Sequence, residues 1–182
     1  MLRSSFPPVH VRRHAEKQVN EMVAIAFQAN PERWTNDGTM RDYLENEDRY
    51  IYWSTPEDEV QARNVPVGIP ALIVRTQSTG RFGLRAIVAV GTVEESPRRY
   101  RPGENDHEFA LPRRLQSPGD DHAASSDWKT GIRLSEVRWE RGIGADRLGD
   151  IDRRIARGEQ GTTAFLVSDE AWRRIIAIWE NA

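Results

Sequence analysis

The sequence predicts an α+β protein with a strongly curved mixed β-sheet, or a small barrel, flanked by short helices. Two observations lead to this fold class. Strand-like apolar segments follow one another without regularly alternating helices, which argues against a doubly wound parallel sheet. The chain of 182 residues is long enough for one domain with its own hydrophobic core, and it contains no internal repeat.

The first half of the chain is expected to combine short strands with one helix. Residues 22–27 have the length of a strand, although periodicity alone would also allow them to continue a helix at 12–18. Asn30 and Pro31 end this segment in either case. The other expected elements are a helix at 39–46 with Thr39 as its N-cap, and strands at 50–53 and 70–76.

The second half opens on a long apolar strand that starts at Leu84. Its alternation places Ile87, Ala89 and Gly91 on one face and the residues between them on the other. A glycine inside a strand, here Gly91, marks a bulge or a close backbone approach. Residues 96–126 have few aliphatic side chains and are expected to form a long loop. After this loop we expect a strand at 129–139, a helix at 150–157 and a strand at 161–167.

The chain is expected to close with an amphipathic helix. Ser168 is a good N-cap for this helix, because its hydroxyl can accept a hydrogen bond from a free main-chain N–H. An apolar stripe follows at helical spacing. We assign this stripe and the preceding Trp139 to core packing; the stripe consists of Trp172, Ile175, Ile176 and Trp179.

Composition excludes several function classes. A net charge of −2 and a pI of about 6.1 argue against a polycationic nucleic-acid coat. Lys17 and Lys129 are lysines and every other basic residue is an arginine. Arginine side chains suit phosphates and base edges. A genome rich in G and C would, however, produce the same preference for arginine over lysine. The absence of cysteine excludes disulfides, cysteine-based zinc sites and thiol nucleophiles. Without a membrane-length apolar run or a signal peptide, we expect a cytoplasmic protein with no membrane partner.

Short motifs occur along the chain in an order that resembles bacterial EVE-domain proteins, which are related to YTH and ASCH domains in the PUA-like superfamily. The resemblance covers residues 22–179. One departure is Gly68-Ile69-Pro70, where the family usually has Gly-Asp before the third strand. The matching motifs are FQANP at 27–31, WS at 53–54, VG at 67–68, GLRAIVAVGTV at 83–93, GEQGTT at 158–163 and EAW at 170–172.

The resemblance implies a PUA-like fold and a reader of modified bases. It divides the chain into an N-terminal extension, 1–21, and an EVE/PUA-like domain, 22–182, with a long loop at 96–127. Such a reader holds one modified, for example methylated, base of DNA or RNA that is flipped out of its stack. It therefore needs aromatic walls for the faces of the base and polar groups for its edge. It does no chemistry itself and needs no cofactor and no metal, so any catalysis would belong to a separate nuclease or processing enzyme.

The resemblance places this pocket where the first strand ends and where neighbouring strands open. Each candidate also has a simpler interpretation: Asn30 is an ordinary turn residue before Pro31, Trp53 can be plain core, and residues 75–78 can be a solvated strand end. The candidates for base binding are Asn30, Trp34, Trp53, Ser54, Arg75, Thr76, Gln77, Ser78 and Trp128. The candidates for phosphate binding are Arg98, Arg99 and Arg101, although acidic residues interleaved in the same loop also fit a solvated mixed-charge segment.

Two other function classes stay open at the level of sequence. The fold could persist in a protein-interaction or regulatory domain that has lost base binding. Alternatively, Asp127-Trp128-Lys129 matches the D/E-x-K element of a metal-dependent nuclease, in which carboxylates hold Mg²⁺ and lysine steadies the attacking water. His10 and His14 have the spacing of helical metal ligands, but no third ligand accompanies them.

Overall fold

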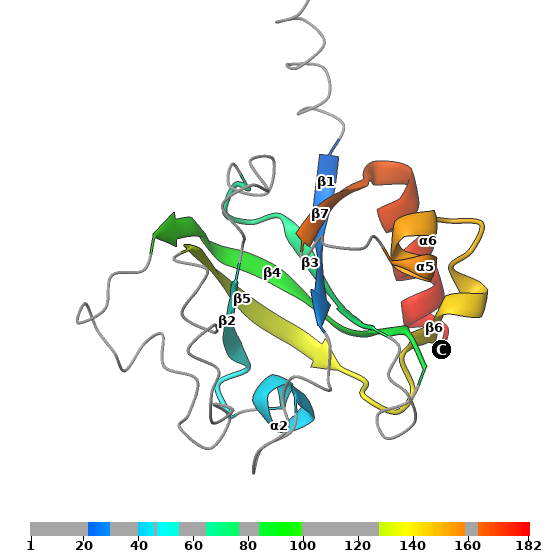
Figure 1. The fold of residues 1–182 in the computed structure, drawn as a ribbon, viewed down its shortest axis with the longest axis horizontal. Coiled ribbons are helices and arrows are strands. Elements are labelled where there is room, and N and C mark those ends of the chain that lie inside the picture. Colours follow the sequence, from blue (N-terminus) through cyan, green and yellow to red (C-terminus); the bar gives the residue numbers. More distant parts are fainter. Residues whose placement is uncertain are drawn as a thin grey trace, which may run out of the picture.

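The fold is a single curved sheet with helices on both of its faces (Figure 1). A computed structural model describes residues 22–29, 40–45, 47–54, 65–76, 84–99, 128–158 and 164–182. The expected helix at 12–18 and the candidates Asn30, Trp34, Gln77, Ser78 and Arg101 lie outside these residues.

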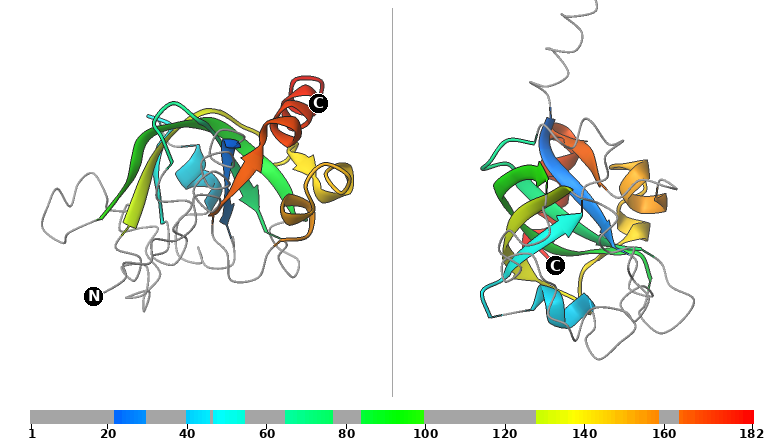
Figure 2. Two further views of the ribbon diagram at one scale, coloured as in Figure 1. Left: turned by 90° about the horizontal axis from the view of Figure 1, so that it is seen from above. Right: turned by 60° about the vertical axis from the view of Figure 1, so that its left-hand side comes forward.

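Seven strands form the sheet, in the order β2-β5-β4-β3-β1-β7, with the short β6 paired to β4. Among the described strand pairs, β1 with β3 is parallel and the others are antiparallel, so the mixed sheet predicted from the sequence is confirmed. The sheet is strongly curved (Figure 2), but within the described residues β2 and β7 do not pair, so the alternative of a closed barrel is wrong. The strands are β1 Met22–Ala29, β2 Tyr50–Ser54, β3 Pro70–Arg75, β4 Ala86–Arg99, β5 Trp128–Val137, β6 Ile143–Gly144 and β7 Ala164–Ser168.

Helices cover the two faces of the sheet unequally. The described helices are α2 Met40–Leu44, the 3-10 helix η3 Ala145–Arg147, α5 Arg153–Arg157 and α6 Asp169–Glu180. Helix α2 packs inside the curve of the sheet, over what we call the concave core, and α5 and α6 pack on the other face, over the helix-side core (Figure 2). Each face of β1 therefore contributes to a different core: Ile25 and Phe27 to the concave one, Ala24 and Ala26 to the other.

The last helix forms as the sequence predicts. The Ser168 hydroxyl accepts a hydrogen bond from the Ala171 N–H at 3.3 Å and caps α6. Ile175 and Trp179 are buried in the helix-side core. The other two stripe residues, Trp172 and Ile176, pack partly buried against that core, and Trp139 is buried in the concave core.

Strand β4 departs from simple alternation. Ala89 lies opposite Ile73 but Ile87 lies opposite Val74, so Val88 is an extra residue in a bulge. Val88 and Ala89 consequently both reach the concave core. The expectation that these two residues lie on opposite faces of the strand is therefore wrong. The prediction for Gly91 is confirmed, because a Cβ there would lie 2.2 Å from the main-chain oxygen of Arg133.

The boundaries of two predicted segments also change. The long loop begins later than expected, because β4 continues to Arg99 and its last residues pair with Trp128 and Lys129 of β5. Helix α5 is shorter than the expected 150–157, because Asp152 is its N-cap. The two-residue β6 and helix η3 lie in a segment where the sequence predicted no element.

Side chains bind main-chain groups on both outermost strands of the sheet. On β2, the Tyr43 hydroxyl accepts from the Tyr52 N–H and donates to the Tyr52 carbonyl, both at 2.9 Å. On β7, Nη2 of Arg154 donates to the Leu166 carbonyl at 2.8 Å. Some main-chain N–H and C=O groups on the outer sides of β2 and β7 thus already have a hydrogen-bond partner within the chain. A further strand would otherwise bind these groups.

Candidate functional site

Strands β1 and β3 end side by side. Ala29 pairs with Arg75 at the ends of these parallel strands, and Ala164 at the start of β7 pairs with Phe27. Thr76, which directly follows β3, therefore lies at the end of the sheet where β1 also ends. Strand β2, which carries the candidates Trp53 and Ser54, does not neighbour β1 or β3: β5 and β4 lie between β2 and β3, and β2 runs antiparallel to β3.

Curvature of the sheet nevertheless brings β2 to the end of β1. The ring of Trp53 lies 6.3 Å from the ring of Phe27, with an angle of 52° between their planes. This contact crosses the concave core, since the two strands are far apart in the order of the sheet. Trp53 is 7% exposed, so most of its indole is covered. The predicted site residue Trp53 thus lies against the strand that leads to Asn30.

A second indole accompanies Trp53. Trp53 pairs with Thr130 of β5, and Trp128 is the diagonal neighbour two residues earlier on that strand. Alternation places Trp128 and the buried Thr130 on the same face of β5, toward the concave core. Trp128 is half-buried. Two indoles and a hydroxyl-bearing side chain therefore share the concave face here, and Ser54 ends β2 next to them, paired with Lys129.

Arg75 is anchored within the fold. Its side chain is 7% exposed, Nε donates to the Leu84 carbonyl at 3.1 Å, and Nη1 donates to the Trp139 carbonyl at 2.9 Å. The guanidinium also lies 4.8 Å from the centre of the Trp139 ring. Burial lowers the pKa of Arg75. Arg75 thus fastens the end of β3 to the turn before β4, and its role in base binding, like that of the half-buried Thr76, stays a prediction.

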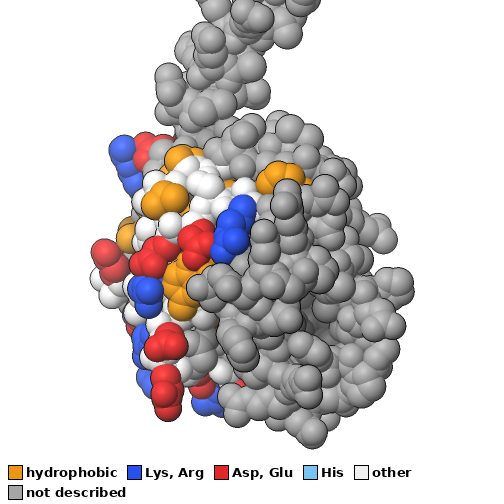
Figure 3. Space-filling view, turned by 90° about the vertical axis from the view of Figure 1, so that its left-hand side faces the viewer, with side chains coloured by type: hydrophobic (Ala, Val, Ile, Leu, Met, Phe, Trp, Pro, Cys, Tyr) orange, Lys and Arg blue, Asp and Glu red, His pale blue; other side chains and the backbone are white. Residues whose placement is uncertain are grey.

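Arg98 lies on a mixed-charge surface formed by the outer face of β2, β5 and β4, where acidic and basic side chains are interspersed (Figure 3). Its Nε lies 3.1 Å from Oε2 of Glu95, and Oε1 of Glu95 accepts hydrogen bonds from Tyr50 at 2.7 Å and Tyr52 at 2.9 Å. Arg98 is therefore paired in the free protein. Phosphate binding by Arg98 and by Arg99, the last residue of β4, stays a prediction.

The Glu95 cluster predicts a pH-dependent stability. Partial burial disfavours the charged carboxylate, but the hydrogen bonds from Tyr50, Tyr52 and Arg98 outweigh it and hold the pKa of Glu95 below its ordinary value. A lowered pKa stabilises the fold above the pKa of the unfolded state, and this stabilisation is lost as the pH falls through the folded value. Glu95→Gln should therefore lower Tm at about pH 6, and the difference from wild type should shrink toward about pH 3.

Thermal melts followed by circular dichroism across this pH range would test the prediction. The control is Glu180→Gln on the exposed side of α6, for which we expect a change within about 0.5 kcal/mol. A Tm difference for Glu95→Gln that stays constant down to low pH would show that the cluster does not hold the carboxylate in its charged form.

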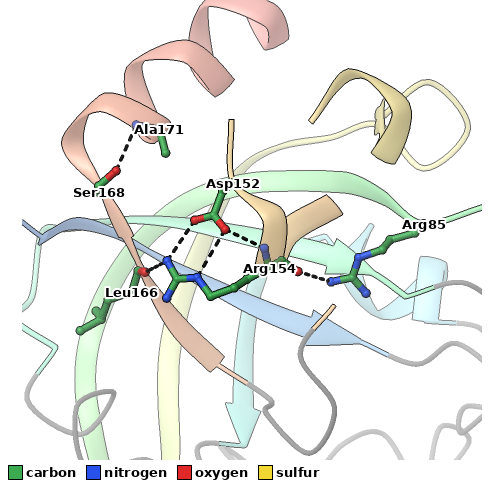
Figure 4. A network of polar contacts seen from close by, with 6 residues as sticks. All are labelled: Arg85, Asp152, Arg154, Leu166, Ser168 and Ala171. Carbon is green, nitrogen blue, oxygen red and sulfur yellow. Dashed lines mark hydrogen bonds and ion pairs between the residues drawn. The ribbon is translucent and has the colours of Figure 1, made fainter. Parts of the chain in front are cut away.

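The structure reveals one residue for which sequence reasoning offered no role. Arg85 is 7% exposed, and its Nε donates to the Ile155 carbonyl at 2.5 Å. Its Nη2 donates to Oε1 of Gln28 at 2.6 Å and to the Arg154 carbonyl at 3.1 Å; Figure 4 shows this last bond. Arg85 thus joins the last turn of α5 to β1, immediately before the predicted site. The sequence does carry one signal for the importance of Arg85, because it is a charged residue at the start of a strongly apolar strand.

The other sequence motifs gain no support from the described part of the chain. Among these residues there is no group of three or more His, Asp or Glu that could hold a metal ion. Lys129 of the nuclease-like motif is half-buried on β5, whereas Asp127, His10 and His14 lie outside the described residues. No described helix has the length and the apolar character needed to cross a membrane.

Solved structures with the same architecture identify the fold. A hypothetical protein from Leishmania major is 10% identical, with a TM-score of 0.56 over 89% of this chain and 97% of that one. Human THYN1, in complex with DNA containing 5-methylcytosine, is 11% identical, with a TM-score of 0.54 over 86% and 97% of the two chains. A variant of an ASCH protein from Zymomonas mobilis is 10% identical, with a TM-score of 0.51 over 86% and 98%.

By sequence, no protein family and no curated protein matches this chain. The structural likeness shows that the chain has the PUA-like fold, shared with the EVE-type domain of THYN1 and with ASCH proteins. The fold that the order of the motifs predicted is thereby confirmed.

Proposed function

We propose that this protein binds nucleic acid and holds one modified base on the concave side of its sheet, without acting on it chemically. The observation that carries the proposal is the placement of Trp53 and Trp128 on one face, with Trp53 packed against Phe27 at the end of β1. Human THYN1, which has the same fold, is known in complex with DNA that contains 5-methylcytosine. That neighbour makes a methylated cytosine the first ligand to test.

The chemistry of the proposed site fits a flat heterocycle. A base can stack on an exposed part of an indole, and a methyl group adds contact with the same aromatic surface. Hydroxyl and amide groups can read the polar edge of the base, and we assign this task to Thr76 and to Asn30. Stacking is worth about 1–3 kcal/mol per base, which is enough to hold one flipped base but not to select a long sequence.

Substitution of Trp128 tests the proposal most directly. Trp128 is half-buried at the start of β5, so its truncation should disturb the fold less than truncation of the buried Trp53. We expect Trp128→Ala to weaken binding of oligonucleotides that carry methylated or hydroxymethylated bases by about 5- to 100-fold. Fluorescence anisotropy with labelled modified and plain strands of one sequence would measure this loss.

The matched control is Trp172→Ala on α6, which removes a partly buried indole from the helix-side core. It should lower stability without changing the preference for modified strands. Equal binding of modified and plain strands by the wild-type protein would contradict base reading. If the Trp172 variant lost the preference for modified strands and the Trp128 variant kept it, the modified base would bind outside the concave side of the sheet.

A protein-interaction domain without base binding is the second candidate. It is favoured by the low exposure of Trp53 and by the use of two Arg75 nitrogens for main-chain carbonyls, which leave little of either side chain free. This candidate predicts that the wild-type protein binds no oligonucleotide in the same titrations.

A further inference from the structure

Helix α5 and the neighbouring η3 carry three exposed arginines that make no ion pair with any described residue. Arg153 and Arg157 are one helical turn apart and both are exposed, as is Arg147 of η3. None of the three makes an ion pair or a hydrogen bond with a side chain in the described part of the chain. By contrast, the exposed Arg41, Arg133 and Arg173 are each paired with a carboxylate.

No acidic side chain in the described residues makes an ion pair with these arginines. Helix α5, with the sequence RRIAR, contains no acidic residue. The side chain of Asp152 is 10% exposed and is bound to Arg154 at 3.0 Å, so it does not pair with Arg153 or Arg157. Asp146 and Asp150 precede the helix, and Glu159, which follows it in the sequence, lies outside the described residues. The outer side of α5 therefore differs from the mixed-charge surface around Glu95.

The short helix is held rigidly by its surroundings. A five-residue helix is not stable alone, so tertiary contacts must fix it. Asp152 caps its first turn by accepting from the Arg154 N–H at 2.8 Å, and the side chain of Arg154 reaches the Leu166 carbonyl of β7 (Figure 4). Arg85 binds two carbonyls of its last turn. The backbone that carries Arg153 and Arg157 is thus fixed before any ligand arrives.

The same contacts join α5 to the end of β1 on the face of the sheet opposite the concave core. The Arg85 guanidinium bridges the Arg154 carbonyl of α5 and Oε1 of Gln28. Gln28 directly follows Phe27, whose ring lies against Trp53 on the other face of the sheet. The backbone of α5 is therefore linked through Arg85 to Gln28, near the end of the strand that carries Phe27.

We propose that Arg153 and Arg157, together with Arg147, bind phosphates of the nucleic-acid strand whose base enters the site; this inference rests on the proposed function. A guanidinium binds phosphate oxygens through two parallel hydrogen bonds, and its charge persists at every physiological pH. Phosphate contacts fix the position of a strand and carry no information about its bases. The α5 arginines thus raise the affinity for any nucleic-acid strand, and the two indoles distinguish a modified base from a plain one.

The test is the double variant Arg153→Gln/Arg157→Gln, titrated with modified and plain oligonucleotides at several salt concentrations. We expect affinity to fall by ~10-fold at low salt for both kinds of strand, and the slope of log K against log salt to decrease by about 2. The ratio of affinities for modified and plain strands should not change. The control is Arg41→Gln/Arg173→Gln, which removes the same charge from paired arginines and should leave the slope as in the wild type.

The outcomes separate this inference from the proposed function. A reduced slope in the α5 variant, with equal wild-type binding of modified and plain strands, would support the phosphate contacts and refute base reading. A slope and an affinity equal to those of the control variant would refute the phosphate contacts, whatever the base preference. Binding of poly-glutamate as tight as that of DNA, with the same dependence on Arg153 and Arg157, would assign the surface to acidic proteins and overturn the proposal.

Discussion

Replacing Gly91 by alanine is expected to lower the free energy of unfolding by about 3 kcal/mol or more. The added Cβ would lie 2.2 Å from the main-chain oxygen of Arg133 and 3.0 Å from Cα of Leu134. Both atoms belong to the backbone of β5, the direct neighbour of β4, so neither can move without opening the pairing of two inner strands. Such a loss is a large part of the about 5–15 kcal/mol that stabilise a typical domain.

Urea titration followed by tryptophan fluorescence would measure the effect. The control is Gly149→Ala, where a Cβ would meet no atom within 4 Å, so its effect should stay within about 0.5 kcal/mol. If both variants unfolded at the same urea concentration, β4 and β5 would have to be able to separate locally at little cost.

Replacing Arg85 by methionine is expected to cost about 2–4 kcal/mol, because it keeps the length of the side chain and removes the guanidinium. The carbonyls of Ile155 and Arg154 and Oε1 of Gln28 would each lose one donor in a largely buried place. Helix α5 would lose the contact that holds its last turn to β1. The hydrogen bond from the Gly158 N–H to the Arg154 carbonyl, at 2.8 Å, should then open more often.

Hydrogen exchange of the α5 amides, measured with the unfolding free energy, would test this expectation. The matched control is Arg173→Met on the exposed side of α6, which breaks a surface ion pair worth at most about 1 kcal/mol. Unchanged exchange at Gly158 in the Arg85 variant would mean that the other contacts of α5 suffice to hold it.

Much of the fold could be predicted because local patterns coincide with burial. The apolar run of β3 and the capped, striped α6 carry their signals within a few residues. Three glycines of the motifs that predicted the PUA-like fold are required by the backbone. Gly68 and Gly158 have φ of 92° and 82°, a region that favours glycine. Gly91 leaves no room for a Cβ beside the neighbouring strand β5. The motif order therefore reflects the backbone as well as side-chain chemistry.

The order of the strands and the details of the site could not be predicted in the same way. The place of β2 beyond β5 depends on pairings between distant segments, which no local pattern encodes. Because of that order, the contact between Trp53 and Phe27 arises from curvature and not from adjacent strands. Likewise, the partners of Arg75 and Arg85 are main-chain carbonyls, and any residue type could supply these acceptors.

The side chains of Tyr43 and Arg154 have a further consequence for how copies of this protein behave when concentrated. An open sheet invites extension, because an exposed outer strand can template a strand from another molecule and begin a fibril or a swapped dimer. Here a phenol engages both main-chain groups of Tyr52, and a guanidinium engages the Leu166 carbonyl. An incoming strand would have to displace these groups first, which protects the curved sheet against growth at either margin.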